Sequence, residues 1–509
     1  MKKRFVFSFI LLFIFTFSGF SQVKGKTIKK SAKKERILLK RKKATTVKNN
    51  NKAKVSVQEN RSEPPSINQV ATAIPAFIGY TEKGPTEPTQ ISSMADYKSK
   101  FGGPSNDDIE TFIVESDGTI TYPSLSASPK YKMYYMLKLY FANGGGDCFI
   151  TSVGSYNNDA YSIKNNEMLA GLSRLNNEDL PTLILFPDAI SSKNRNQPTA
   201  LYKAALAQCA ERRDRFLICD VEEVDTNIEK SAENFRFAMG TQNLQFGAAY
   251  FPTLATSLNY TFSEDKIKVK LGNKDLVLRH TDKTILNEAA KNEQSLYHID
   301  NGRYRKQYQE IKNFINAKNL ELPPSAAVAG IYATVDASRG VWKAPANISL
   351  NKVSAPKINI DRNTQAGLNV HSSGKSINAI RSFSGKGVLV WGARTLAGNN
   401  NEWKYISVKR LGISIEESVN NALERFKYEP NNARTWTLAK AMTENYLNGL
   451  WRAGALSGAK PEDAFFVSVG LGKTMTPQDV QEGKMIMIIG IAASRPAEFN
   501  ILNFSQKMN

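Results

Sequence analysis

The last sixty residues of this 509-residue chain constrain its fold more than any other stretch. Phe465–Val469 is a short apolar run, Thr476 followed by Pro477 is typical of a helix start, and Met485–Ala492 is almost continuously apolar. Thr476 can accept hydrogen bonds from the free amides of the first helical turn, and Pro477 fits there because its missing N–H would be unpaired anyway. Gly483 is suited to end this helix. The order is strand, helix, strand, and Met485–Ala492 is predicted to be a core strand covered on both faces.

The chain then ends in a segment with apolar side chains on both sides. In an extended strand, Phe499 and Ile501 point one way, whereas Leu502 and Phe504 point the other way. Such a strand needs a partner, which is either a sheet of its own molecule or the sheet edge of a neighbour. The candidate interface residues at this end are the strand and its two polar neighbours: Arg495, Glu498, Phe499, Ile501, Leu502 and Phe504.

The amino terminus has the pattern of a secretory signal peptide. Residues 2–4 are basic and precede sixteen mostly apolar residues, Phe5–Phe20, and small residues lie at −3 and −1 of a cleavage point before Gln22. The apolar run is shorter than the about 20 residues that span a bilayer. A cleaved signal is therefore our first interpretation, with an uncleaved membrane anchor and a misassigned start as the alternatives.

Positive charge is concentrated in the same region. Residues 2–54 carry 17 Lys and Arg and one acid, so they hold most of the net charge of +21, and the rest of the chain is nearly balanced. Val23–Lys54 is Lys-rich and lacks apolar periodicity, which is typical of a solvated, disordered arm. Anionic membrane or nucleic acid are weaker alternatives for this arm. We expect no nucleic-acid partner, and membrane contact only through the amino-terminal segment if it stays uncleaved.

The sequence offers no convincing catalytic, metal or cofactor site. Gly470–Thr474 reads GLGKT, but a phosphate-binding loop needs a further glycine where this chain has Val467, so a polar hairpin loop is expected. The acid pair Glu416 and Glu417 is assigned to the start of a helix capped by Ser414. Neither the cysteines nor the histidines have the spacing of a metal site. They are Cys148, Cys209, Cys219, His280, His298 and His371. An enzyme is the least favoured class.

Several long segments follow one another in a recognisable order. They are AIPAFIGYTEKGP at Ala73–Pro85, SAAVAGIYATVDASRGVWKAPAN at Ser325–Asn347, INAIRSFSGKGVLVWGARTL at Ile377–Leu396, WKYISVKRLGISIEESV at Trp403–Val419, WRAGAL at Trp451–Leu456, PEDAFFV at Pro461–Val467 and RPAEF at Arg495–Phe499. In this order they resemble the contractile tail sheath family of phage tails and phage-tail-like injection systems. The resemblance covers most of the chain after Ala73.

The resemblance implies a mixed α/β fold. Its core domain would be built from amino- and carboxy-terminal segments, with an inserted outward-facing α/β domain and extended arms at both ends. The expected parts are a signal or hydrophobic segment (1–21), a basic region with the amino arm (22–69), the first part of the core (70–104), the inserted outer domain (105–322), the second part of the core (323–493) and the carboxy arm (494–509).

The resemblance also implies a structural subunit rather than an enzyme. Such a subunit polymerises as stacked six-fold rings around an inner tube, contacts baseplate and cap proteins, and contracts to drive the tube through a target envelope. By position, Val55–Ala71 would be the amino arm and Ser494–Asn509 the carboxy arm, each linked to neighbours by strand addition. The candidate interface residues at the amino side alternate as a strand before Pro75: Val70, Thr72 and Ile74. Each of these strands could instead be ordinary intramolecular sheet.

The family and the amino terminus point to different locations. The family implies assembly in a cytoplasm or a virion, whereas the signal-like segment suggests export or membrane attachment. The alternative function is therefore an exported surface or adhesive protein on a sheath-like fold.

Overall fold

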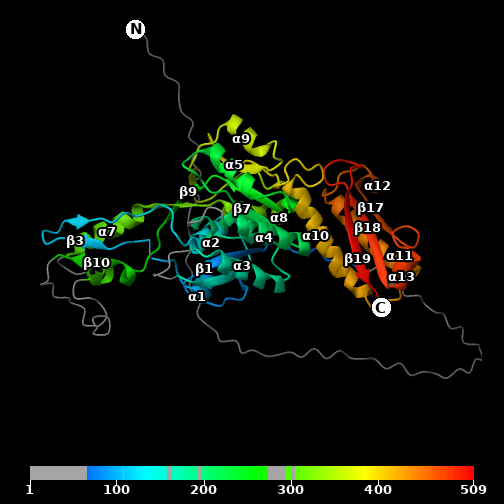
Figure 1. The fold of residues 1–509 in the computed structure, drawn as a ribbon, viewed down its shortest axis with the longest axis horizontal. Coiled ribbons are helices and arrows are strands. Elements are labelled where there is room, and N and C mark those ends of the chain that lie inside the picture. The colour runs from blue at the N-terminus through cyan, green and yellow to red at the C-terminus, as the bar shows by residue number, and fades with distance from the viewer. Residues whose placement is uncertain are drawn as a thin grey trace, which may run out of the picture. The chain divides into compact units, whose positions relative to one another are not determined.

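The computed structural model describes residues 66–106, 108–156, 163–192, 197–272, 293–299 and 304–508. The signal-like segment, the basic region and most of the expected amino arm lie outside these residues. Within the described residues the fold is mixed α/β, as predicted, and buried apolar side chains form two clusters. The larger cluster contains the strands of a nine-stranded sheet, and the smaller one contains a three-stranded sheet near the carboxy terminus (Figure 1).

The nine-stranded sheet has the order β13-β16-β15-β8-β7-β6-β1-β5-β2. The six strands from β15 to β5 run parallel, and the flanking strands pair antiparallel. Every residue of β1 is buried, as expected for a parallel sheet covered on both faces. The strand bounds are β1 (Pro75–Thr81), β2 (Thr89–Ile91), β5 (Cys148–Ser155), β6 (Leu183–Leu185), β7 (Phe216–Asp220), β8 (Gly247–Phe251), β13 (Ile348–Ser349), β15 (Ile377–Phe383) and β16 (Gly387–Val390).

Helices that pack in pairs accompany this sheet. Helix α2 contacts α8 and β1, whereas α3 contacts α4, β1 and β5. A Cβ at Gly330 of α8 would lie 2.6 Å from the carbonyl oxygen of Tyr140 in α2, so only glycine allows the two helices to approach this closely. The helix bounds are α1 (Met94–Phe101), α2 (Met133–Ala142), α3 (Asn165–Arg174), α4 (Gln197–Arg212), α5 (Ile228–Ala238), α8 (Ser325–Arg339) and α9 (Arg362–Asn369).

Two smaller sheets have the orders β11-β10-β3-β4 and β12-β9-β14. The first packs with α7 through aromatic rings: the ring centroid of Phe314 lies 5.9 Å from that of Phe112 and 4.7 Å from that of Tyr122 (Figure 1). The bounds are β3 (Phe112–Val114), β4 (Ile120–Thr121), β9 (Leu254–Asn259), β10 (Lys268–Leu271), β11 (Glu293–Ser295), β12 (Asn319–Leu322), β14 (Val353–Pro356) and α7 (Arg305–Ala317).

The expected outer-domain range, 105–322, differs from the observed sheets. Strands β5, β6, β7 and β8 fall inside this range, yet β1 lies between β5 and β6, and β15 pairs with β8. The expected boundaries divide the chain into consecutive ranges, whereas parallel strands pair across long connections between such ranges. The part of this range that forms a sheet of its own is β3, β4, β10 and β11.

The carboxy-terminal part contains the strand, helix and strand predicted from the sequence. The amide of Asp479 donates to the hydroxyl of Thr476 at 3.2 Å, and the amide of Thr476 donates to the carboxylate of Asp479 at 2.8 Å, which is a capping box. Gly483 follows the helix with a φ of +70°. The bounds are α10 (Ile406–Leu423), α11 (Ala433–Arg452), α12 (Pro461–Ala464), β17 (Phe465–Val469), α13 (Pro477–Gln481), β18 (Lys484–Ile491) and β19 (Asn500–Lys507).

Helix α10 is shared by the two apolar clusters. Ile406 and Ile413 belong to the larger cluster, and Leu411 and Ile415 to the smaller one. Ser414 lies in the middle of this helix and is 3% exposed, so the helix start predicted there is wrong. The helix already begins at Ile406, because its residues before Ser414 are buried by packing. A capping side chain acts only where the amides of a first turn are unpaired, and in mid-helix they are paired.

Candidate assembly interface

The carboxy-terminal sheet, β17-β18-β19, has one fully covered face. Met485, Met487 and Ile489 of β18 are at most 1% exposed and belong to the smaller apolar cluster. The alternate residues Ile486 and Ile488 are only half-buried. The prediction that both faces of this strand are covered is therefore wrong for the single chain. It assumed a parallel sheet between helices, whereas β18 is the middle strand of an antiparallel sheet.

The open face carries a cross-strand row of residues, called the outer row here: Phe466 of β17, Gly490 of β18 and Ile501 of β19. Phe466 is 38% exposed and Ile501 is 45% exposed. The ring of Phe466 covers Gly490, where a Cβ would lie 2.1 Å from a ring atom, and it also meets the ring of Phe499 at 5.1 Å. The outer row is thus an apolar surface held in place by its own ring packing.

Strand β19 pairs with β18 of the same chain over its eight residues. Leu502 and Phe504 are 1% and 3% exposed on the inner face, opposite to Ile501. Their orientation follows the alternation seen in the sequence. The single chain thus adopts the intramolecular pairing left open above, and contact of these residues with a neighbouring copy stays a prediction.

The connection between β18 and β19, residues 492–499, is weakly held. Its centre, 494–498, is exposed. The ion pair between Arg495 and Glu498, at 3.3 Å, joins side chains that are 74% and 63% exposed, so solvent screening leaves it little stabilising effect. The amide of Ala497 donates to the carbonyl of Asp463 at 2.9 Å. Backbone bonds of Ala492 with Ala464 and Ser457 hold the start of this connection.

The amino-side candidates do not form the predicted strand. The first strand begins at Pro75, and residues 66–74 belong to no helix or strand. The amide of Val70 donates to the Ser418 hydroxyl at 3.1 Å, and the amide of Ile74 donates to the Thr182 hydroxyl at 2.9 Å. Only its last residue meets a strand, because the carbonyl of Ile74 accepts from the amides of Thr182 at 2.8 Å and of Leu183, the first residue of β6, at 3.2 Å. Before Ile74, side chains of distant helices bind the segment.

The segment 66–70 also contacts the smaller apolar cluster, which contains the carboxy-terminal sheet. Ile67 packs against the smaller apolar cluster, and Ser418, the partner of Val70, lies on α10. Strand β19 contacts the same helix. The two ends of the described chain therefore meet around α10, which no local pattern in the sequence indicates.

Sequence reasoning missed the charged side of α10. Lys409, Arg410 and Glu416 are at most 6% exposed in this helix. The Lys409 ammonium lies 3.9 Å from the ring centroid of Phe246, and burial lowers the pKa of Lys409 to about 8. Burial, together with the charge of nearby Asp214, raises the pKa of Glu417 to about 7. Long charged side chains at positions expected to be apolar are the signal that could have revealed this face.

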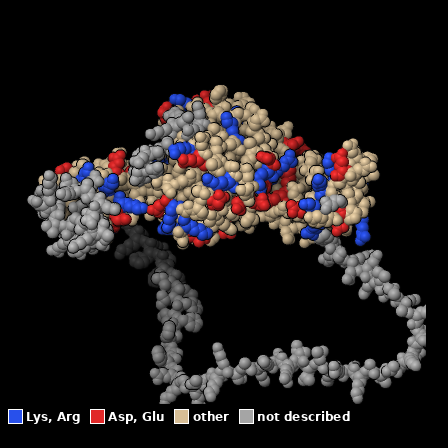
Figure 2. All heavy atoms as spheres, turned by 60° about the horizontal axis from the view of Figure 1, so that its bottom comes forward, with Lys and Arg blue, Asp and Glu red and all other residues tan. Residues whose placement is uncertain are grey.

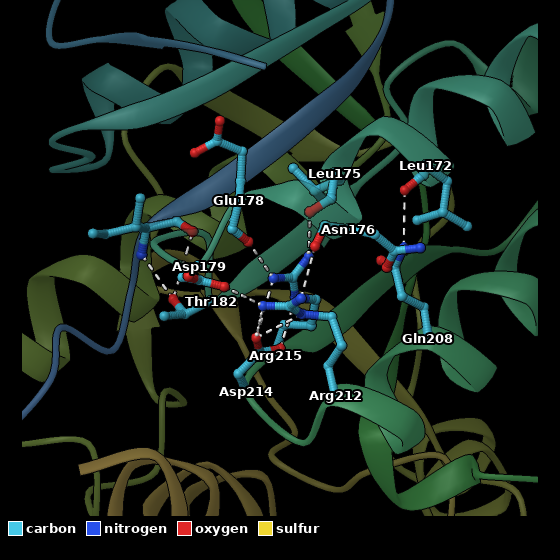
Figure 3. A network of polar contacts seen from close by, with 11 residues as sticks. Leu172, Leu175, Asn176, Glu178, Asp179, Thr182, Gln208, Arg212, Asp214 and Arg215 are labelled. Carbon is cyan, nitrogen blue, oxygen red and sulfur yellow. Dashed lines mark hydrogen bonds and ion pairs between the residues drawn. The ribbon is translucent and has the colours of Figure 1, made fainter. Parts of the chain in front are cut away.

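A polar network supports the loop that carries Thr182 (Figure 3). The guanidinium of Arg215, which is fully buried, donates to Asp214 at 2.8 Å and to the carbonyls of Leu175 at 3.0 Å and Glu178 at 2.7 Å. Arg212 binds Asp214 from the other side at 2.8 Å. This network fixes the loop that carries Thr182, the acceptor for Ile74.

The place where this fold type binds small ligands is filled by the chain itself. The order β5-β1-β6-β7-β8 reverses direction between β1 and β6, and ligands of doubly wound folds bind at that edge. Here Asp188 is 0% exposed and accepts from the amides of Tyr80 at 2.8 Å and Lys132 at 2.5 Å. A Cβ at Gly79 would lie 2.5 Å from its carboxylate. Burial raises the pKa of Asp188. Asp188 and its partners therefore fill this edge of the sheet.

Other classes of site find no support in the part of the chain that the structure describes. None of its His, Cys, Asp and Glu side chains form a group of three or more that could hold a metal ion, and the three cysteines are buried and unpaired. No described helix is both long and apolar enough to cross a bilayer. On the face drawn in Figure 2, basic and acidic side chains are interspersed, which agrees with the nearly balanced charge of the body.

The fold defines a class: a mixed α/β protein with a large packed sheet and a small sheet that leaves one face partly open. Residues 196–396 match the phage tail sheath protein central domain, and residues 399–507 match the phage tail sheath C-terminal domain. The chain belongs to the contractile tail sheath family.

Individual relatives agree with this family along most of the chain. The sheath complex of PVC, an extracellular contractile injection system, in its contracted state is 29% identical with a TM-score of 0.58, covering 91% of this chain and 99% of that chain. The helical sheath of the anti-feeding prophage in its contracted state is 30% identical with a TM-score of 0.58, covering 89% and 98%. The tail sheath protein of Vibrio phage KVP40 is 21% identical over 215 residues, or 42% of this chain, and the match spans 30% of that relative.

Proposed function

We propose that this chain is the sheath subunit of a contractile injection particle. It polymerises as stacked six-fold rings around an inner tube, is attached to baseplate and cap proteins, and contracts to drive the tube through a target envelope. The observation that carries this proposal is the meeting of both described chain ends at α10, next to a small sheet with an open face. Likeness to sheath chains over nearly their whole length supports it.

The pairing of β19 with β18 supplies the template for links between subunits. A neighbour's β19 would form the same eight-residue ladder, so exchange between copies changes few contacts and its main cost is entropy. Each backbone bond contributes roughly 1 kcal/mol net. Phe504 and Leu502 would fill the same inner pockets in the neighbour. Strand addition of this kind joins copies without any new binding site.

The connection between the strands is long enough for this exchange. Residues 492–499 form a run of eight residues between β18 and β19, which spans up to about 28 Å when extended. With such a tether, each strand remains at high effective concentration beside its partner sheet. The expected carboxy arm, 494–509, thus contains most of this connection and the whole of β19.

Linked arms allow a sheath to shorten without coming apart. The large α/β bodies are free to rotate and to form larger contacts in the short state while the arms keep neighbours joined. The energy of contraction is then stored at assembly as poorer packing between bodies, and the subunit needs no nucleotide. The packed edge at Asp188 agrees with a body that does no chemistry.

Electron microscopy of the purified full chain tests this function. We expect ordered tubes or rings, and a variant lacking residues 494–509 should form neither while its circular dichroism shows the large sheet still folded. A full chain that remains a stable monomer at high concentration, or a truncated chain that forms tubes as before, contradicts the proposal.

The alternative function, an exported surface or adhesive protein on this fold, rests on the signal-like amino terminus, which lies outside the described residues. Amino-terminal sequencing of the protein from its native cell distinguishes the two. A mature chain beginning at Gln22 supports export, whereas an intact amino terminus in a particle fraction supports assembly inside the cell.

A further inference from the structure

We infer that Arg410 is the positioning residue for the root of the amino arm, residues 66–74. This inference rests on the proposed function, because it concerns how the arm leaves the body of the subunit. The arm root belongs to no helix or strand, so packing and a few hydrogen bonds place it. The question is which bond is fixed firmly enough to set its direction.

The guanidinium of Arg410 binds the arm root and the body at once. Its Nη1 and Nη2 donate to the two carboxylate oxygens of Asp336 at 3.0 and 2.6 Å, and Nη2 also donates to the carbonyl of Thr72 at 2.7 Å. The Thr72 hydroxyl donates to Asp336 at 2.5 Å. Thr72 therefore uses both its backbone and its side chain on one buried ion pair.

This ion pair is anchored in the large sheet. The side chains of Arg410 and Asp336 are 3% and 7% exposed. The guanidinium lies 4.5 Å from the ring centroid of Tyr332, whose hydroxyl is 2.8 Å from that of Tyr250 in the central strand β8. A planar fork held by a carboxylate and an aromatic ring has one orientation, so the second N–H of Nη2 points in one direction. The carbonyl of Thr72 is bound at that point.

The other bonds of the arm root lie on either side of Thr72. The amide of Val70 binds the Ser418 hydroxyl, and a hydroxyl rotates to suit its partner. At Ile74 the amide binds the Thr182 hydroxyl and the carbonyl accepts from the amides of Thr182 and Leu183, which fixes the end of the root next to β1 and leaves the path before it to Arg410. Arg410 and Ser418 both lie on α10, eight residues apart, and Asp336 lies on α8. The arm root thus follows the line between these helices, and the arm leaves the body beside the carboxy-terminal sheet.

Hydrogen exchange on the unassembled full chain tests this assignment. Arg410→Lys keeps the charge but loses the fork, and Thr72→Val removes the hydroxyl bond alone. We expect exchange of the amides in 67–74 to become about tenfold faster in Arg410→Lys and about threefold faster in Thr72→Val. The matched control is Arg236→Lys: Arg236 is also buried and binds the carbonyls of Lys375, Gly367 and Leu368, away from the arm root. It should leave exchange in 67–74 unchanged.

Unchanged exchange in both variants overturns the inference, as does an equal increase in Arg236→Lys, which would indicate general loosening. Electron microscopy of the same variants supplies the second measurement. We expect fewer tubes from Arg410→Lys and Thr72→Val than from the parent and from Arg236→Lys, and equal yields from all four proteins contradict a role of the arm root in assembly. If the parent itself forms no tubes while the exchange result holds, the proposed function fails and the anchoring by Arg410 stands.

Discussion

The nine-stranded and three-stranded sheets differ in how their faces are covered. In the large sheet, strands such as β1 are buried along their whole length, and its ligand edge is packed with its own polar groups. In the small sheet, one face is buried and the outer row remains half open. A sheet covered on both faces has no surface to share, whereas a sheet covered on one face does. The first therefore suits a rigid body, and the second suits a connector.

Loss of Arg215 should have the largest effect on stability, because its side chain is fully buried in the body that contains the nine-stranded sheet. Replacing it by Met removes the fully buried partner of the Asp214 carboxylate and one donor each to the carbonyls of Leu175 and Glu178. We expect the free energy of unfolding to fall by about 4 kcal/mol, measured by urea denaturation. The control is the adjacent Arg213→Met: this side chain is 58% exposed and lies 3.7 Å from the Glu416 carboxylate, so a change of about 1 kcal/mol or less is expected. Equal losses in both variants would contradict the assigned difference.

Two positions of β19 sharpen the comparison inside the connector. Phe504→Ala removes an inner ring that is 3% exposed and should destabilise the small sheet by about 3 kcal/mol. Ile501→Ala, on the open face, should change the stability of the unassembled chain by less than about 1 kcal/mol but reduce the yield of tubes. Urea denaturation and electron microscopy give the two readings. An Ile501→Ala variant with normal tubes would remove the outer row from the interface.

A methyl group at Gly490 tests whether the outer row is held by ring packing. Gly490→Ala places a Cβ against Phe466 and should cost about 2 kcal/mol through overpacking of the ring. Gly449 in α11 is the matched control, since a Cβ there meets nothing within 4 Å, and Gly449→Ala should stabilise the helix by about 0.5–1 kcal/mol. If both substitutions stabilise the protein in thermal unfolding, Phe466 moves freely and the outer row is not a fixed surface.

The sequence predicted features that depend on neighbouring residues. The helix start at Thr476 and the two strands around this helix follow from local chemistry. The failures have one cause in common: the deciding partner is distant in sequence. Ser414 was predicted to start a helix from the residues next to it. The packing of α10 between two apolar clusters, which extends the helix upstream, depends on distant residues. Likewise β1 pairs with β5 and β6, an order that composition cannot specify.

The candidate site shows the same division. The alternation of Ile501 with Leu502 and Phe504 gave the correct faces of β19, because side-chain direction in a strand is local. Which sheet β19 joins is not local, and neither is the ion pair of Arg410 with Asp336, which lie 74 positions apart. The alternation of Val70, Thr72 and Ile74 was read as a strand, although side chains from three different parts of the chain bind this segment.

The smallest expected effect concerns the boundary between the two regions, where Glu417 of α10 faces Asp214, Arg212, Arg215 and Asp179. Because burial and Asp214 raise the pKa of Glu417 from 4.5 to about 7, the folded protein binds a proton there that the unfolded chain releases at lower pH. This stabilisation is complete below about pH 4.5 and is lost as the pH rises through about 7. After allowance for the solvent that reaches this half-buried carboxyl, we expect a decrease of about 1 kcal/mol between pH 5 and pH 8.

Glu417→Gln isolates this contribution, because the amide cannot ionise. Urea midpoints of the variant should fall less between pH 5 and pH 8 than those of the parent. The remaining decrease should come from groups such as Asp220, whose pKa burial also raises to about 7. Asp479→Asn is the control from the connector: there the hydrogen bonds of Thr476 lower the carboxyl pKa, so its contribution has the opposite sign and is lost only in acid. Parallel pH profiles for the parent and Glu417→Gln would show that the Glu417 carboxyl is solvated, and would contradict its burial between α10 and the loop of Asp214.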